Sequence, residues 1–228
     1  ILEGLSRMKI QRKAALVEHL RQHLGTIFNK QLAVPTGSKN DLVGKLSLFI
    51  EGKSVIPVDP LFLTPGALGF DDDSSRPQPF QSIKIAIEQG NIKGILRCEF
   101  ALVEPTFWLK DKKGSPISPK NRHGARFEIA KQYEGINIYR HDRLIDTVSN
   151  IPKYVWSNAP KGIKTKWLNN DRTVRVALYF EPVLDEFFGV EVTKQQAMPN
   201  EFIWNTLKEN GFFATISAMA TADAQARR

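Results

Sequence analysis

The sequence has few of the residues and patterns on which most enzyme classes depend. Its single cysteine, Cys98, excludes an internal disulfide framework and fits a reducing cytoplasm. The surrounding stretch, "GILRCEFALV", is apolar, so we expect Cys98 to be a small buried residue and not a catalytic thiol. No run of about 18 apolar residues is present, and the N-terminal stretch lacks the layout of a secretory signal. The sequence therefore predicts a cytoplasmic protein with no membrane partner.

Motifs that bind nucleotides or carry nucleophiles are also missing. The chain contains no Walker loop, no dinucleotide glycine fingerprint and no G-x-S-x-G elbow. Two of its four histidines, His19 and His23, have the i, i+4 spacing of a zinc-binding pair. However, "HLRQH" lacks the glutamate of a catalytic zinc helix, and no third ligand is evident. We therefore expect no metal site and no self-contained enzyme active site.

What the sequence does have is basic charge. The net charge is +8 over 228 residues, and the pI is near 9.6. Such an excess suits a polyanionic partner, nucleic acid or nucleotide phosphate, although solubility alone also explains it. The residues expected to contact nucleic acid fall in two basic stretches, and they are Lys110, Lys112, Lys113, Lys120, Arg122 and Arg126 in the first and Lys161, Lys164, Lys166 and Arg172 in the second.

The second basic stretch also contains aromatic side chains. Lys153 and Arg175 flank it, and Tyr154, Trp156 and Trp167 lie between its cations. Cations would contact phosphates while aromatic rings stack on bases. Tryptophans beside strands are also common in core packing, so the pattern leaves both interpretations open.

Apolar periodicity predicts a mixed chain with more strand than helix. A stripe with a four-residue repeat predicts a helix from about residue 6 to 30. Alternation and turn residues predict hairpins at 46–55, at 83–104 and at 136–145, the last turning at His141 and Asp142, and a strand at 174–180. A helix is expected from about Pro199 to Asn210, ended by Gly211. These elements predict the α+β class.

The composition changes most sharply in "FDDDSSRPQP", which we interpret as part of a linker or mobile loop. It divides the chain into a first part at 1–64, a linker at 65–80, a main domain at 81–210 and a C-terminal helix or tail at 211–228. Residues 105–126 are expected to form a long basic loop.

Two stretches that follow one another along the chain have a pattern more specific than alternation or charge alone. "EGINIYRHDRLID" is followed about forty residues later by "VRVALYFEPVLDEFFGVEVTKQQAMP". These stretches contain an aromatic and basic strand, a tight turn, Arg-Leu-Ile, and then a strand leading to Leu-Asp-Glu-Phe-Phe-Gly and a lysine loop. In this order they resemble the transducer domain of GHKL ATPases. Within that superfamily the chain looks closest to the bacterial MutL/MORC-like branch. The front, "EHLRQHLGTIFNKQL" before "KLSLFIEGKSVIPVDPLF", resembles the last helix and strand of the preceding Bergerat-type ATP-binding domain.

The resemblance implies a ribosomal-protein-like β-α-β transducer, with a mixed sheet and flanking helices, that works as a homodimer. It also implies that a loop lysine, here Lys194, reaches the γ-phosphate of ATP, with Gln195 supporting it. An ammonium group at a loop tip donates to that phosphate and loses its partner once the phosphate leaves. The pattern alone also fits a solvated Thr-Lys turn before a helix.

The motifs that bind ATP in this superfamily are absent from the chain. The Asn-bearing helix, the Asp-x-Gly-x-Gly stretch and the glycine-rich lid do not occur. We therefore expect ATP and Mg²⁺ to bind only together with an ATP-binding domain upstream in the same parent chain, and this part alone not to hydrolyse ATP. The alternative is a non-enzymatic, basic nucleic-acid-binding module, and DNA is a candidate partner under both hypotheses.

Overall fold

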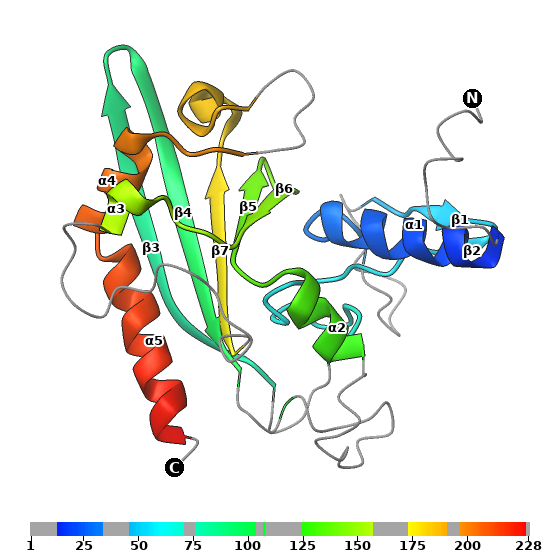
Figure 1. Ribbon diagram of the computed structural model, residues 1–228. Helices are drawn as coiled ribbons and strands as arrows, with labels where there is room; N and C mark the ends of the chain where they lie inside the picture. Colours follow the sequence, from blue (N-terminus) through cyan, green and yellow to red (C-terminus); the bar gives the residue numbers. More distant parts are fainter. Residues whose placement is uncertain are drawn as a thin grey trace.

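The computed structural model describes residues 13–33, 46–70, 76–103, 107, 125–156, 173–190 and 197–226. Its centre is a five-stranded mixed sheet with the strand order β3-β4-β7-β5-β6 (Figure 1). The bounds of these strands are β3 (Gln78–Gln89), β4 (Ile92–Leu102), β5 (Ile136–Arg140), β6 (Arg143–Val148) and β7 (Val174–Phe180). All neighbouring strands are antiparallel except β5 and β7, which are parallel. The described part of the chain belongs to the α+β class, as predicted.

Strands β3 and β4 form a long hairpin in the predicted place. Ile85 and Ile87 alternate with exposed residues on β3, and they pair with Leu96 and Gly94 on β4. The turn is made by Gly90 and Asn91, and Gly90 has a φ of 58°, which a residue without a Cβ adopts at little cost. The period-2 pattern and the turn residues are therefore sufficient to explain this hairpin.

Strand β7 lies between β4 and β5, and all seven of its residues are buried. One of these buried residues is a cation, Arg175, which is only 1% exposed. The guanidinium group donates to the carbonyl oxygens of Pro60 at 2.7 Å, Ala130 at 3.1 Å and Tyr133 at 2.9 Å. Arg175 flanks a basic stretch in the sequence, but here it joins three parts of the chain inside the protein.

One face of the sheet is covered by helices (Figure 1). They are α3 (Lys153–Trp156), the 3₁₀ helix η5 (Pro182–Phe188), α4 (Glu201–Glu209) and α5 (Phe212–Ala226). Trp204 and Phe212 pack with Phe100, Ile138 and Leu178 of the sheet in the main core cluster. Asn200 Oδ1 caps α4 by accepting from the Ile203 backbone N–H at 3.0 Å, and Gly211 follows α4 with a φ of 80°. The predicted helix at 199–210 is thus confirmed within one or two residues at each end.

The opposite face is covered by α2 (Ala125–Gln132) and by the segment from Val55 to Phe70. Leu61 packs with Tyr139 and Tyr179, whose rings are stacked with centroids 4.7 Å apart. Phe62 packs with Val103 and Ile129 in a separate cluster. Helix α2 and an irregular segment therefore share this face of the sheet.

The chain begins its described part with α1 (Lys13–Ile27), followed by the small hairpin β1 (Phe49–Ile50) and β2 (Lys53–Ser54). The hairpin is in the predicted place. Asp59, which is fully buried, accepts from the backbone N–H groups of Leu61, Leu63 and Thr64 at 3.0–3.1 Å. One carboxylate therefore holds the loop that leads from this hairpin toward the sheet.

The predicted linker at 65–80 lies partly within the described residues. Ala67 is 5% exposed, and the Gly69 carbonyl oxygen accepts from Arg126 at 2.9 Å, while Gln78 and Pro79 already belong to β3. Its described parts thus include packed residues and the start of β3. Three described helices, α2, α3 and η5, were not predicted from the sequence. Residues 125 and 126, expected at the end of a basic loop, begin α2.

None of the described helices has both the length and the apolar composition that a membrane crossing requires. Cys98 is fully buried in the core, as expected. Burial raises the pKa of its thiol to about 12, so this side chain does not provide a thiolate nucleophile near neutral pH.

Candidate functional site

The hairpin of β5 and β6 turns at two residues with left-handed backbone conformations. His141 has a φ of 47° and Asp142 a φ of 62°, the pattern of a type I′ turn, in which an Asp is tolerated. Arg140 is the last residue of β5 and Arg143 the first residue of β6. The tight turn therefore places two arginines at the same end of the hairpin.

Arg140 joins this hairpin to the 3₁₀ helix after β7. Its Nε lies 2.6 Å from Asp185 Oδ1 and its Nη2 lies 2.7 Å from Asp185 Oδ2. These are the two parallel bonds of a bidentate pair, and both side chains are less than a third exposed. The hydrogen bond to Asp185 raises the pKa of Arg140, and burial partly offsets this effect. Residues 45 positions apart in the chain are thus held together by charge and by geometry.

A carboxylate of the hairpin itself, that of Asp146, binds the backbone just after residue 196. Asp146 on β6 accepts from the Ala197 backbone N–H through Oδ2 at 3.0 Å, and from the Thr147 backbone N–H through Oδ1 at 2.7 Å. Met198 and Asn200 also donate to carbonyl oxygens of η5, those of Phe188 and Phe187, both at 2.8 Å. Residues 197–200 are therefore tied both to the hairpin and to η5.

The chain is held in a similar way just before residue 191. The Val190 backbone N–H donates to the Asp185 carbonyl oxygen at 3.1 Å, and Gly189 ends η5 with a φ of 56°. Asp185 is also the partner of Arg140. The described residues on both sides of 191–196 are thus anchored to the β5 and β6 hairpin, one side through Arg140 and the other through Asp146.

The region of α1 and the turn after it makes polar contacts near the same hairpin. Asn29 Nδ2 donates to the Tyr139 hydroxyl at 2.8 Å, and the Tyr133 hydroxyl donates to Thr26 Oγ1 at 3.0 Å. Burial raises the pKa of Tyr139 well above its usual value, so its hydroxyl stays neutral and keeps these hydrogen bonds over the physiological pH range. The first hydrogen bond joins the turn after α1 to β5, and the second joins α1 to the residue that follows α2. Side-chain hydrogen bonds make such a contact more specific in geometry than an apolar one.

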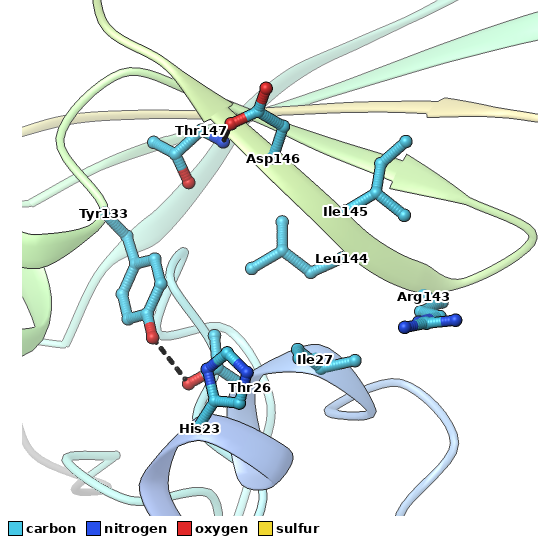
Figure 2. Close-up of a pocket in the computed structure, with 9 residues that line it drawn as sticks. All are labelled: His23, Thr26, Ile27, Tyr133, Arg143, Leu144, Ile145, Asp146 and Thr147. Carbon is cyan, nitrogen blue, oxygen red and sulfur yellow. Dashed lines mark hydrogen bonds between the residues drawn. The ribbon is translucent and has the colours of Figure 1, made fainter. Parts of the chain in front are cut away.

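A pocket of about 380 Å³ opens where α1 meets β6. Figure 2 shows His23, Thr26 and Ile27 of α1 facing Arg143 and Leu144 of β6, while Tyr133 closes one side. Asp146 and Thr147 complete the lining. None of these residues was predicted from the sequence to bind a small molecule. His23 was considered only for zinc, and the lining residues outside α1 lie more than a hundred positions away from it, which left no local pattern to find.

Most of the predicted site residues lie outside the described residues. These are Lys194 and Gln195 of the predicted nucleotide sensor, and Lys110, Lys112, Lys113, Lys120, Arg122, Lys161, Lys164, Lys166 and Arg172 of the predicted nucleic-acid contacts. The first basic stretch has one predicted contact inside the described part, Arg126, and the second has none.

The position of Arg126 differs from the prediction. It is 6% exposed, and it donates to the carbonyl oxygens of Gly69 at 2.9 Å and Phe107 at 3.2 Å. Its guanidinium group also lies 3.9 Å from the centre of the Phe107 ring. A guanidinium that is enclosed by backbone acceptors and an aromatic ring is not presented to a phosphate, so Arg126 is a structural cation.

Among the described residues, no group of three or more histidine, cysteine, aspartate or glutamate side chains is arranged to hold a metal ion. His19 and His23 stack with ring centroids 6.0 Å apart. Partial desolvation, followed by the positive charges of His19 and Arg143, lowers the pKa of His23.

The fold defines this part of the chain as an α+β protein with a mixed sheet, one helical face and a polar junction between α1 and the hairpin. No protein-family model matches the sequence, and no curated protein or solved structure shows a significant match.

Proposed function

We propose that this chain is the transducer part of a GHKL-type ATPase that senses the nucleotide through Lys194 and couples nucleotide state to dimer closure. ATP and Mg²⁺ bind in the ATP-binding domain of the same parent chain, for which residues 1–64 supply the last helix and hairpin. Gln195 supports the lysine. The parent acts in the cytoplasm as a homodimer, and DNA is its substrate.

The observation that carries this proposal is the convergence of the resembling motifs around residues 191–196. Arg140 of "GINIYR" binds Asp185 of "LDEFFG" through two bonds. Asp146 of "RLID" binds the backbone of Ala197 in "QAMP". Motifs that are separated in the sequence thus meet at the two described ends of the sensor segment, as expected if they act together.

This arrangement supports a mechanical route from nucleotide to sheet. When Lys194 donates to a γ-phosphate, the position of the sensor segment becomes fixed, and its anchors transmit that position to β5 and β6. The hairpin also contacts the turn that follows α1, where Asn29 donates to Tyr139. Loss of the phosphate removes the partner of the ammonium group and releases this constraint.

The proposal is tested by Lys194→Ala in the full-length parent protein. A positioned cation at a phosphoryl group contributes about tenfold to a thousandfold to turnover, so ATP hydrolysis should fall by at least about tenfold. Gln195→Ala should have a smaller effect, because a neutral amide donates a weaker hydrogen bond.

The matched control is Lys84→Ala, which removes an exposed lysine from β3, the edge strand opposite β6. Its turnover should equal that of the wild type. If Lys194→Ala left turnover unchanged while circular dichroism showed an intact fold, the assignment of Lys194 as the sensor would be wrong.

The second candidate function, a basic nucleic-acid-binding module, is favoured by one described feature. Lys153 and Tyr154 are adjacent and exposed on α3, the Tyr154 ring being 49% exposed. A cation beside an accessible ring is the combination that binds single strands by phosphate contact and stacking. This function is compatible with the first, since a transducer can also contact DNA.

A further inference from the structure

The pocket between α1 and β6 has the size and position of a small-molecule site. Its volume of about 380 Å³ lies within the range of about 300–1,000 Å³ that is usual for ligand pockets. Its lining comes from three separate parts of the chain, around His23, Tyr133 and Arg143. Pockets at such junctions are common binding sites, because the parts on either side can supply different chemical groups.

The Arg143 side chain has neither a hydrogen bond nor an ion pair with any of the described residues. Its Nε is buried without a hydrogen bond, and among the described residues its side chain makes a ring contact with Phe28 at 5.5 Å but no ion pair. The other arginines of the sheet behave differently. Arg140 has Asp185 and Arg175 has three carbonyl oxygens. The Nε of Arg143 has almost no accessible surface, so a ligand in the pocket would meet the positive charge and the outer nitrogens of this partly exposed side chain, which has no carboxylate partner among the described residues.

The acidic residue in the pocket does not serve as that partner. Both carboxylate oxygens of Asp146 already accept backbone N–H groups, from Thr147 and Ala197. The hydroxyl groups are also engaged, because Thr26 Oγ1 donates to the Gln22 carbonyl oxygen at 2.9 Å and accepts from Tyr133. The Thr147 hydroxyl donates to Asn137 Oδ1 at 3.1 Å, so the groups left with free hydrogen-bonding capacity in the lining are the Arg143 guanidinium and the His23 ring.

The remaining lining indicates what accompanies the charged group of a ligand. Ile27, Leu144 and Ile145 supply apolar surface, and His23, an exposed residue, supplies an imidazole ring. A ligand that fits would carry one oxyanion toward Arg143 and a small apolar body against these side chains. Carboxylates and phosphate monoesters share this chemistry.

We propose that the pocket lined by Arg143, His23 and Tyr133 binds a small molecule bearing a single oxyanion, a carboxylate or a phosphate monoester. This site is formed entirely by described residues and does not include Lys194. It is therefore independent of the nucleotide-sensing role proposed above, and either proposal can fail without the other.

The test is titration of the 228-residue chain with inorganic phosphate and with acetate at low salt, followed by calorimetry and by backbone amide NMR. At least one anion should bind saturably and shift the resonances of residues 143–147 and 23–27. Arg143→Gln should weaken this binding by at least about tenfold. Arg97→Gln is the matched control, because Arg97 lies over the Tyr179 ring with Glu99 and Asp142 as partners, and it should leave binding unchanged.

The two anions also identify the chemical class. Binding of phosphate alone indicates a phosphate monoester, binding of acetate alone indicates a carboxylate, and either result supports the proposal. Absence of saturable binding by both anions would overturn it. So would binding of equal strength in Arg143→Gln, or shifts confined to residues far from the pocket.

A second measurement remains informative even if Arg143→Gln fails to fold. The charged and titratable groups around His23 are His19 on its own helix, Arg143 and Asp146 on β6, and Tyr133 after α2. A bound anion adds negative charge beside Arg143, so the His23 pKa, lowered in the free protein, should rise when phosphate or acetate binds the wild-type chain. A His23 titration curve that neither anion changes would contradict the proposal.

Discussion

Arg140 and Asp185 show how much one pair of side chains contributes to the arrangement of this molecule. The pair connects β5 with η5 through two short bonds, and it also fixes the residue whose carbonyl oxygen accepts from Val190. Hydrogen bonds to charged groups contribute about 1.5–3 kcal/mol each when partly buried. Because both partners are less than a third exposed, solvent screens this pair less than it screens a surface ion pair.

Asp185→Asn should lower the free energy of unfolding by about 1–3 kcal/mol, because the amide removes the charge and one of the two acceptor oxygens. Chemical denaturation measures this change. The control is Glu186→Gln, a neighbouring acidic residue that is exposed, and it should stay within about 0.5 kcal/mol of the wild type. Equal stability of Asp185→Asn and the control would show that the pair contributes nothing.

At the scale of elements, α1 lies unusually close to the segment that follows β2. The Val58 backbone N–H donates to the Gly25 carbonyl oxygen at 2.9 Å. A Cβ at Gly25 would collide with the Ile56 carbonyl oxygen, which belongs to the backbone and cannot move aside as a side chain can. The close approach of these two segments therefore depends on glycine at position 25.

Gly25→Ala tests this contact. Alanine favours a helix over glycine by about 1 kcal/mol, but overpacking against a backbone atom costs about 1–3 kcal/mol. We expect a net loss of stability of up to about 2 kcal/mol by thermal or chemical unfolding. Gln22→Ala, at an exposed position of the same helix, should be nearly neutral, and a stabilised Gly25→Ala would show that the segments separate easily.

At the scale of the whole molecule, the net charge of +8 is the property that bears on DNA. Arg126 and Arg175 supply part of that charge, but both are buried and bound to carbonyl oxygens. The positive charge available to a polyanion is therefore smaller than the composition indicates.

A salt titration of DNA binding measures how much of the charge is used. If the basic stretches contact six to ten phosphates, affinity should fall about 10³-fold to 10⁵-fold between 50 and 200 mM salt. Arg126→Lys should not change the salt dependence, because that side chain is enclosed in the protein. The absence of measurable binding at low salt would remove the nucleic-acid-binding function.

The elements that the sequence predicts well are those governed by short-range rules. The hairpin of β3 and β4 follows from alternation around Gly90, and the hairpin of β5 and β6 from the turn at His141 and Asp142. Helix α4 follows from the proline just before it, Pro199, and from Gly211 after it. In each case the determining residues lie within a few positions of one another, so a local pattern is enough.

The candidate sites could be predicted only in part, because they depend on contacts across the chain. The resemblance predicts Lys194 as a nucleotide sensor. The contacts that hold the residues on either side of 191–196, between Arg140 and Asp185 and between Asp146 and Ala197, follow only from the structure. The pocket at Arg143 brings together residues more than a hundred positions apart. No periodicity in the sequence records such a meeting.

The sequence by itself determined the α+β class, the hairpins and the helix at 201–209, since these follow from local backbone preferences and from the burial of alternating apolar residues. Only the tertiary structure decided which charged residues are internal. Arg126, Arg175 and Asp59 look like surface residues in the sequence, yet each is buried and satisfied by polar groups of the chain itself. The physical reason is that burying a charge depends on hydrogen-bond partners from distant segments, which exist only once the chain has folded.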